Sequence, residues 1–273
     1  MNDRAKELHD DLMAQVGELR TSKEWLDAMT AAARFHSYSF GNWMLMWAQA
    51  DRRGMTVTRP AGYRAWQGFG RQVRKGEKGL KIFAPMAKKD DDGNVSVFGF
   101  RVATVFDVSQ TDGEPLPDMG APALLEGDGD TIVQDAAVAM IEDEGFTFRF
   151  DVLSGPNGTT NHGSKEVVVD SRLAPAQATK TTVHELAHVL LHGDRSLFDC
   201  RGRVEVEAES VAYVVCAAAG LDTSSYSVAY VAGWSEDTGD AEKVMLATAE
   251  RVVKTARKVL AVVADVELIG AAA

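Results

Sequence analysis

VHELAHVLLH, residues 183–192, decides the fold of the second half of the chain, because it sets the pattern His-Glu-x-x-His inside an apolar helical repeat. Apolar side chains recur at helical spacing, at Val183, Leu186, Ala187 and Leu190. Residues four apart on a helix share one face, so His184 and His188 can hold one metal ion. Glu185 beside them is expected to be the general base that accepts a proton from the water that the metal activates.

A third metal ligand must come from outside this pattern, since hydrolytic zinc sites have three protein ligands and one open position. His192 lies one more turn along the same helix, and three residues spanning about 12 Å cannot share an ion. We therefore expect His192 outside the ligand set, either as a residue of the helix end or as a residue that supports a metal ligand from behind. The next predicted helix, residues 204–219, offers Glu205, Glu207 and Glu209. Glu207 shares the apolar stripe of that helix, which predicts an inward-facing ligand, whereas Glu205 and Glu209 are expected to be more exposed.

The predicted chemistry is metal-assisted hydrolysis with Glu185 as the catalytic residue. Zn²⁺ is the expected ion, although the same nitrogen and oxygen ligands accept other divalent metals. An oxyanion donor could come from Tyr226, Tyr230 or His162, and the sequence does not choose among them. The alternatives are a structural metal site without catalysis and an ordinary core helix with solvated histidines.

Composition places the chain among ordinary globular proteins. Its 273 residues, 45% hydrophobic and 25% charged, can bury one large or two modest cores. No apolar run approaches a membrane span, and the first residues, MNDRAKELHDDL, are too charged for a secretory signal. Cys200 and Cys216 form no disulfide framework or metal motif. We expect a cytoplasmic protein that does not associate with membranes.

Charge is distributed unevenly along the chain. The net charge is −11, yet the segment from Arg52 to Lys89 contains eleven basic residues and one acid, Glu77, for a net +10. Such asymmetry predicts two domains with different partners.

Aromatic residues flank or interleave this basic segment: Phe35, Tyr38, Phe40, Trp43, Trp47, Tyr63, Trp66 and Phe69. Rings that stack on bases and cations that follow phosphates suit single-stranded DNA, with double-stranded DNA as a further candidate. The predicted nucleic-acid-binding residues are Arg64, Trp66, Arg71, Arg74, Lys75, Lys78 and Lys81. The alternative is that the aromatic residues form the core of a small domain, as we expect for Trp43 and Trp47, four apart on a helix.

Periodicity along the chain predicts an α+β protein of two domains. Residues 1–112 are expected to form a nucleic-acid-binding module of helices and a β-hairpin built from residues 80–83 and 95–108. Residues 113–128, rich in Gly, Pro and acids, are the predicted linker. Residues 129–273 are expected to form a mainly helical zincin-like domain with a small sheet. Its predicted elements are helices at 132–140, 175–193, 204–219 and 241–263 and strands at 146–152 and 167–170, joined by a polar loop.

Several stretches resemble a known family. SYSFGNWMLMWAQ (37–49), GYRAWQGFGRQVRKGEKGLKIFAP (62–85) and VFDVSQTDGEPLP (105–117) are similar to the N-terminal module of ArdC-type antirestriction proteins of plasmids and phages. HELAHVLLH (184–192) and RVEVEAESVAYVVCAAAGLDTSSYS (203–227) resemble their metallopeptidase domain, which is related to the ImmA/IrrE peptidases. The resemblance covers nearly the whole chain except the linker.

The resemblance implies a domain that binds single-stranded DNA, joined to a zinc peptidase-like domain, for which a protein is a candidate substrate. It also implies protection of incoming DNA from restriction. It favours His184, His188 and Glu207 as ligands and Glu185 as the catalytic residue. Thermolysin-like enzymes carry an Asp four residues after the glutamate ligand, where this chain has Val211. Two alternatives stay open: a DNA-binding antirestriction protein with an inactive metal site, and a regulatory metalloprotease whose basic face binds an acidic protein.

Overall fold

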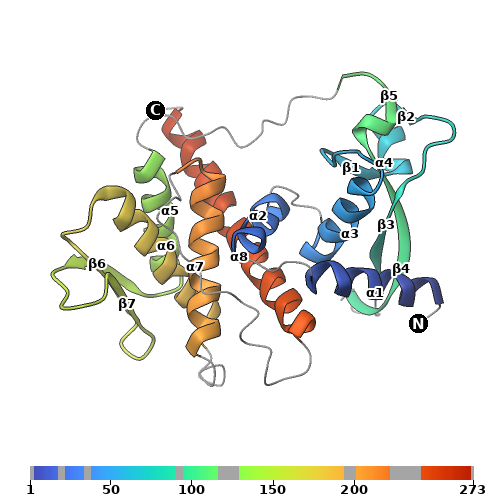
Figure 1. Cartoon of the computed structure of the whole chain (residues 1–273). Coiled ribbons are helices and arrows are strands. Elements are labelled where there is room, and N and C mark those ends of the chain that lie inside the picture. Colours follow the sequence, from blue (N-terminus) through green and yellow to red (C-terminus); the bar gives the residue numbers. More distant parts are fainter. Residues whose placement is uncertain are drawn as a thin grey trace. The chain divides into compact units, whose positions relative to one another are not determined.

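A computed structural model describes residues 3–17, 22–33, 38–89, 95–115, 129–193, 201–221 and 241–271 (Figure 1). The chain forms two compact units, Met1–Glu18 with Gly41–Met119 and Leu19–Phe40 with Gly120–Ala273. Both contain helices, and their sheets are small, which confirms the predicted α+β class. None of the described helices combines the length and apolar character that crossing a bilayer needs.

The first unit is organised around a long β-hairpin, as predicted. β3 (Leu80–Lys89) pairs antiparallel with β4 (Val95–Asp107), and β1 (Pro60–Gly62) pairs with the other edge of β4. A second, two-stranded sheet joins β2 (Arg71–Val73) to β5 (Thr111–Gly113). The other elements of this unit are α1 (Asp3–Gly17), α3 (Phe40–Asp51), α4 (Tyr63–Gly68) and the 3-10 helix η1 (Val108–Gln110).

Helix α3 covers the free edge of β3. The side-chain amide of Asn42 donates to the carbonyl of Phe83 and accepts from its N–H, both at 2.8 Å. The amide of Gln49 makes the same pair of bonds with the backbone of Lys81, also at 2.8 Å. An uncovered strand edge leaves backbone groups unpaired. The two side-chain amides, seven residues apart on the helix, form hydrogen bonds with backbone groups of β3 that would otherwise be open to a neighbouring strand.

Asp107, at the end of β4, joins three segments of the first unit. It is fully buried, and its carboxylate accepts the backbone N–H groups of Thr58 (2.7 Å), Arg59 (2.8 Å) and Ser109 (3.0 Å). The side chain of Gln110 accepts the N–H of Asp107 in return, at 3.0 Å. Burial acts to raise the pKa of Asp107, but the hydrogen bonds to its ionised form outweigh burial and hold that pKa below 3.8.

The second unit is a layer of helices beside a three-stranded sheet. The helices of this unit are α5 (Gly129–Asp143), α6 (Pro175–Leu191), α7 (Arg201–Ala218) and α8 (Ala241–Ala271). Helix α5 packs against α6, α6 against α7, and α7 against α8. The sheet has the order β6-β8-β7. β6 (Thr147–Asp151) is parallel and β7 (Gly158–Asn161) antiparallel to β8 (Glu166–Asp170), and α6 lies against β7 and β8. The sequence predicted these helices and the strands β6 and β8, but it assigned β7 to a loop.

Helix α2 (Ser22–Ala33) belongs to the second compact unit, although its residues fall within the predicted domain of residues 1–112. Trp25 is fully buried, and its indole N–H lies 3.4 Å from the hydroxyl oxygen of Ser210 on α7. Arg257 of α8 donates to the carbonyl of Ala32 at 2.5 Å. The apolar face of α2 is therefore buried against α7 and α8. The predicted linker, residues 113–128, lies mostly outside the described residues.

Replacing Asp107 with Ala is expected to lower the free energy of unfolding by about 2–4 kcal/mol, because buried N–H groups lose their acceptor. The folded pKa lies below 3.8, so this stabilisation is present above that pH and is lost as the pH falls through the folded pKa. Urea unfolding at neutral and acidic pH measures both effects. Asp112→Ala is the control, since its side chain is 73% exposed. Equal losses in the two variants would contradict the assignment.

Candidate metal centre

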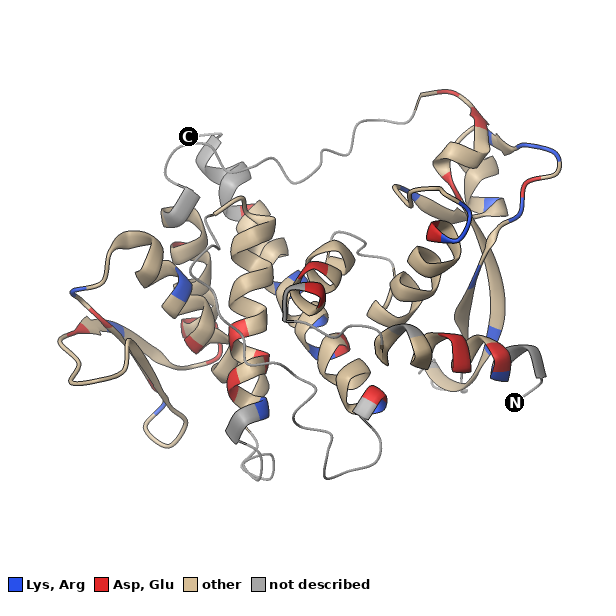
Figure 2. Cartoon of the chain, viewed as in Figure 1, with Lys and Arg blue, Asp and Glu red and all other residues tan. Residues whose placement is uncertain are grey.

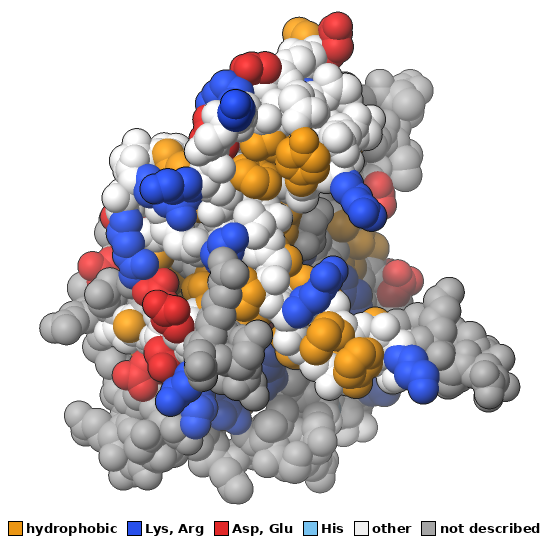
Figure 3. Space-filling view, turned by 90° about the vertical axis from the view of Figure 1, so that its right-hand side faces the viewer, with side chains coloured by type: hydrophobic (Ala, Val, Ile, Leu, Met, Phe, Trp, Pro, Cys, Tyr) orange, Lys and Arg blue, Asp and Glu red, His pale blue; other side chains and the backbone are white. Residues whose placement is uncertain are grey.

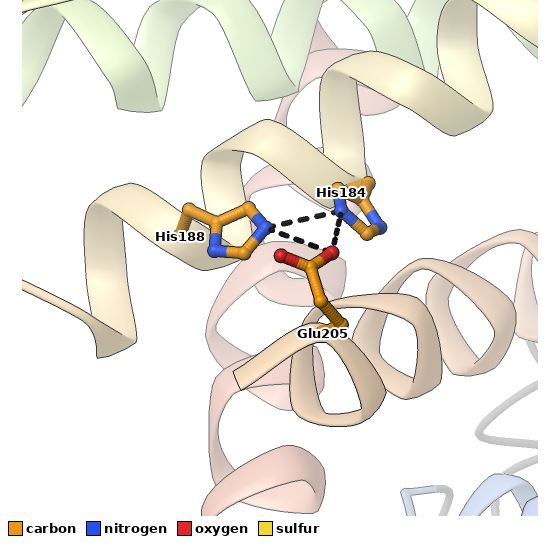
Figure 4. A group of neighbouring side chains, drawn as sticks. All are labelled: His184, His188 and Glu205. Atoms are coloured by element: carbon orange, nitrogen blue, oxygen red, sulfur yellow. Dashed lines mark hydrogen bonds and ion pairs between the residues drawn. The ribbon is translucent and has the colours of Figure 1, made fainter. Parts of the chain in front are cut away.

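Helix α6 presents its two motif histidines to one side. Pro175 starts the helix, where a missing N–H costs nothing, and His192 ends it. The Nε2 atoms of His184 and His188 lie 3.0 Å apart, and Figure 4 shows both rings turned toward the same point. The two side chains are 19% and 13% exposed. The structure thus brings together the two histidines that the helical spacing predicts to converge.

Glu205, from the first turns of α7, completes the group. Its Oε2 lies 3.5 Å from Nε2 of His184 and 3.8 Å from Nε2 of His188 (Figure 4). All three candidate ligand atoms lie within 4.8 Å of one another. The Glu205 side chain is 64% exposed, which leaves one side of the group open. Two imidazoles, one carboxylate and an open side fit the donor set of a catalytic divalent metal.

Glu207, the third ligand that the sequence predicted, lies elsewhere, and that assignment is corrected. It is 1% exposed, as its place in the apolar stripe indicated. Its Oε2, however, lies 3.1 Å from Nε2 of His192 and 3.1 Å from Nη2 of Arg251 on α8. Residues two apart on a helix point about 200° apart, so Glu207 is directed away from the point where Glu205 meets the two motif histidines. The inward face of α7 leads into the core, and the cleft lies beside its more exposed face.

With Glu207 as the predicted ligand, Val211 stood at the position where thermolysin-like enzymes carry an Asp. With Glu205 as the candidate ligand, this position is occupied by an acid. Four residues after Glu205 is Glu209, whose Oε2 lies 3.2 Å from Nδ1 of His184. Its other oxygen forms an ion pair with Lys180 at 2.6 Å. Four residues is close to one helical turn, so Glu205 and Glu209 approach His184 from the same side of α7. The carboxylate of Glu209 fixes the orientation of the ring from behind.

The electrostatics of this group favour a cation. Burial acts to lower the pKa of His184, but hydrogen bonds to Glu205 and Glu209 outweigh it and raise that pKa to about 9. Burial and the neighbouring positive charge lower the pKa of His188. The pKa of Glu205 is lowered, first by its contact with His184. The acids surrounding the two rings thus stabilise positive charge between them.

Glu185 lies in the same cleft and is only 5% exposed. Burial raises the pKa of its carboxyl group, and the hydroxyl of Thr160, which donates to Oε2 at 2.7 Å, moderates that shift. Thr160 belongs to β7, the strand that sequence reasoning missed. The two β-branched residues, Thr159 and Thr160, were the only signal in the sequence, whereas the alternating exposure along this strand appears only in the structure. Strand β7 therefore forms one wall of the site and holds the carboxylate.

The cleft has a volume of about 640 Å³. It is bounded by β7 with the loop before it, by α6 and by the start of α7, and its polar lining includes Asn157, Thr160, His162, Lys180, His184, Glu185, His188, Glu205 and Glu209. His162, one of the expected oxyanion donors, lines this cleft and packs edge-on against the ring of Phe146. Tyr226 and Tyr230 lie outside the described residues.

The aromatic residues of the first unit are not all buried or exposed as the sequence predicted. Trp66 is fully buried and its indole N–H donates to the carbonyl of Phe106 at 2.9 Å, so its predicted role in stacking on bases is wrong. Of the pair expected in the core, Trp43 is buried, but Trp47 is 44% exposed. A tryptophan in a basic segment can belong to a core or a surface, and local sequence does not distinguish the two.

Several predicted phosphate contacts are already engaged within the protein. Arg71 donates to the side chain and carbonyl of Thr111 and to the carbonyl of Gly113. Arg74 pairs with Glu77 and Asp112. Lys81 donates to the hydroxyl of Thr104 at 2.6 Å. The remaining predicted cations, Arg64, Lys75 and Lys78, are exposed.

Comparison with known proteins agrees with this two-part organisation. Residues 2–114 match the N-terminal domain of anti-restriction factor ArdC, and residues 145–219 match the IrrE N-terminal-like domain, a peptidase family. The chain is 24% identical to the uncharacterized protein pXO2-81 of Bacillus anthracis over 89% of its own length and 48% of that protein. It thus spans about half the length of this relative.

Crystal structures give a similar result. The metal-free antirestriction protein ArdC from the R388 plasmid matches with a TM-score of 0.51 and 24% identity, over 82% of this chain and 85% of that one. Its Mn(II)-bound form gives a TM-score of 0.48 and 23% identity, over 82% and 88%.

These matches define a protein with an ArdC N-terminal domain followed by a peptidase-like domain that carries the His184–His188–Glu205 group. Both parts of the chain thus resemble the corresponding parts of ArdC-type antirestriction proteins.

Gly158→Ala is expected to lower the free energy of unfolding by about 1–3 kcal/mol through overpacking. A Cβ at this position would lie 2.6 Å from Oε1 of Glu185 and 2.7 Å from Cγ2 of Thr181. Thermal denaturation measures the loss. Thr159→Ala, on an exposed residue of the same strand, is the matched control. A Gly158 variant as stable as the control would show that β7 can move away from Glu185.

Proposed function

We propose that the second unit is a metal-dependent hydrolase that acts on a protein, and that His184, His188 and Glu205 hold the metal. The observation that carries this proposal is the convergence of these three residues and Glu185 in one cleft. When bound, a divalent metal such as Zn²⁺ supplies Lewis-acid activation of water and of the scissile carbonyl. The R388 ArdC protein has been crystallised with Mn(II) bound, so manganese is a second candidate ion.

Glu185 is the proposed general base. Its buried carboxylate has a raised pKa, which makes it a better proton acceptor than an exposed glutamate. The hydroxyl of Thr160 holds one carboxylate oxygen of Glu185 at 2.7 Å and so fixes the orientation of the carboxylate in the cleft. His162 lines the cleft and is the proposed donor of a hydrogen bond to the developing oxyanion.

Metal removal and a change at Glu185 should separate binding from catalysis. We expect purified protein to bind one divalent ion per chain and His188→Ala to lose it. Glu185→Gln should keep the metal but cleave casein about 10²–10⁴-fold more slowly, because only the proton acceptor is lost. Metal analysis and peptide mapping measure the two quantities. Glu142→Gln, at an exposed glutamate on α5, is the matched control.

The outcomes decide between two functions. Wild-type protein that binds no divalent ion would contradict the hydrolase. A Glu185→Gln variant that still protects DNA from restriction in cells would favour the second candidate, a DNA-binding antirestriction protein with a structural metal site.

We further propose that the first unit binds single-stranded DNA over the open face of its β-hairpin. Residues at alternate positions of β4 share a face, and the strand register places Lys81 opposite Thr104 and Pro85 opposite Phe100 on it. This face carries Phe83, Phe100 and Phe106 together with Lys81. Phe100 is 62% exposed. Figure 3 shows hydrophobic side chains at the surface of the molecule with Lys and Arg side chains between them.

Cations lie at one end of this face. Lys75 and Lys78 are exposed on the loop between β2 and β3, which is marked by basic residues in Figure 2. Lys88 and Arg101 are also exposed on the hairpin, but they alternate with the residues of this face and point to the other side. Tyr63, 44% exposed, packs edge-on against Phe106. Exposed rings beside exposed cations provide stacking for bases and neutralisation for phosphates. The proposed partner is a single strand lying along β4.

Oligonucleotide binding should depend on both the rings and the cations. Phe100→Ala is expected to weaken binding of a labelled oligothymidylate about tenfold or more through lost stacking. Lys78→Ala should reduce the slope of log affinity against log salt by about 0.7, the value for one phosphate contact on a single strand. Fluorescence anisotropy measures both. Phe150→Ala, at a 48% exposed phenylalanine in the second unit, is the control. A salt-independent affinity would instead favour an acidic protein partner.

A further inference from the structure

A chain of buried polar groups runs from His188 through His192, which also lines the cleft, into the core at Glu207. Nδ1 of His188 lies 3.0 Å from Nδ1 of His192, and Nε2 of His192 lies 3.1 Å from Oε2 of Glu207. Nη2 of Arg251, on α8, lies 3.1 Å from the same carboxylate oxygen. It also donates to the carbonyl of Leu191 at 3.2 Å, which fixes α8 to the end of α6. The chain thus connects three helices.

Because the polar groups that follow His188 are buried, each of them needs a partner within the protein. His192 is 3% and Glu207 is 1% exposed. An ionised carboxylate at such a depth is costly unless it is paired, and its partners here are His192 and Arg251. Among the described residues, the second oxygen of Glu207 has no hydrogen-bond partner. A buried acid held at this cost indicates a role beyond packing, because an apolar side chain would fill the same space.

The arrangement of nitrogen atoms selects one tautomer of His188. The Nε2 atoms of His184 and His188 face Glu205, so Nε2 is the nitrogen that His188 offers to a metal. A neutral imidazole with a free Nε2 carries its proton on Nδ1. That N–H needs an acceptor, and Nδ1 of His192 is within reach. His192 then carries its own proton on Nε2 and donates it to Glu207.

We propose that His192 and Glu207 are positioning residues that hold His188 in the metal-binding tautomer and orientation. This inference rests on the proposed metal site. His184 receives a carboxylate directly from Glu209, whereas His188 receives one through an intervening imidazole. Acceptors behind a metal-binding histidine commonly change metal affinity 10–100-fold. Arg251 of α8 pairs with Glu207 at the end of this series of polar groups. Helix α8 therefore contributes to the metal affinity of a site that it does not line.

The first test is Zn²⁺ affinity of the full chain, measured by competition with a chromophoric chelator. Glu207→Gln is expected to bind Zn²⁺ about 10–100-fold more weakly while circular dichroism and melting temperature show a folded protein. Glu142→Gln should bind like the wild type. Unchanged affinity in a folded Glu207→Gln variant would overturn the proposal.

Two substitutions at His192 test the same idea if Glu207→Gln fails to fold. His192→Gln keeps an oxygen that can accept the Nδ1 proton of His188, whereas His192→Leu keeps none. We expect His192→Gln to bind Zn²⁺ within about threefold of the wild type and His192→Leu to bind about tenfold or more weakly. Equal affinities of the two variants would overturn the proposal, since loss of packing alone would affect both.

A measurement on metal-free protein separates this inference from the proposed function. Nitrogen-15 NMR of the imidazoles should show His188 protonated on Nδ1 in the wild type and a mixture of tautomers in Glu207→Gln. Wild-type protein that binds no Zn²⁺ would contradict the metal site. A mixture of tautomers in the wild type would contradict the positioning role, whatever the metal result.

Discussion

The packing of α6 against α7 is the contact on which the rest of the candidate site depends. Three glutamates at alternate positions of α7 meet different parts of α6 because each step of two residues turns the side chain by about 200°. Glu205 lies near the Nε2 atoms of His184 and His188, Glu209 contacts Nδ1 of His184, and Glu207 contacts His192. One short helical segment thus supplies a candidate ligand and support for both histidines. A rotation of α7 about its own axis would disturb all three contacts together.

The acids of this region differ in how deeply they are buried and in what surrounds them. Glu207, within the core, is balanced by Arg251 and His192 and stays away from the cleft. Glu185 is nearly as buried but faces the cleft, where burial raises the pKa of its carboxyl group. Glu205 is largely exposed at the rim. The same side-chain chemistry serves charge balance at Glu207 and, in the proposed function, proton acceptance at Glu185 and metal binding at Glu205, and the surroundings of each carboxylate determine which.

The division into two units depends on which residues are buried together, and it does not follow the order of the sequence. The N-terminal helix α2 buries Trp25 beside Ser210, 185 positions later in the chain, so the second unit is completed by a segment that precedes the hairpin. In the first unit, Asn42 and Gln49 close the edge of β3, while the outer face of β4 retains exposed rings. The covered edge and the open face are consistent with a surface available to a partner.

Local sequence determined the elements whose pattern repeats within a few residues. The stripe around His184 and His188 predicted α6 and the convergence of the two rings, and the alternation flanking residues 90–94 predicted the hairpin. The tertiary structure alone decided that Glu205 faces the rings, that β7 holds Glu185, and that Trp66 is buried while Trp47 is exposed. Periodicity shows which residues share a face, but the direction of that face depends on the neighbouring elements, which long-range packing selects.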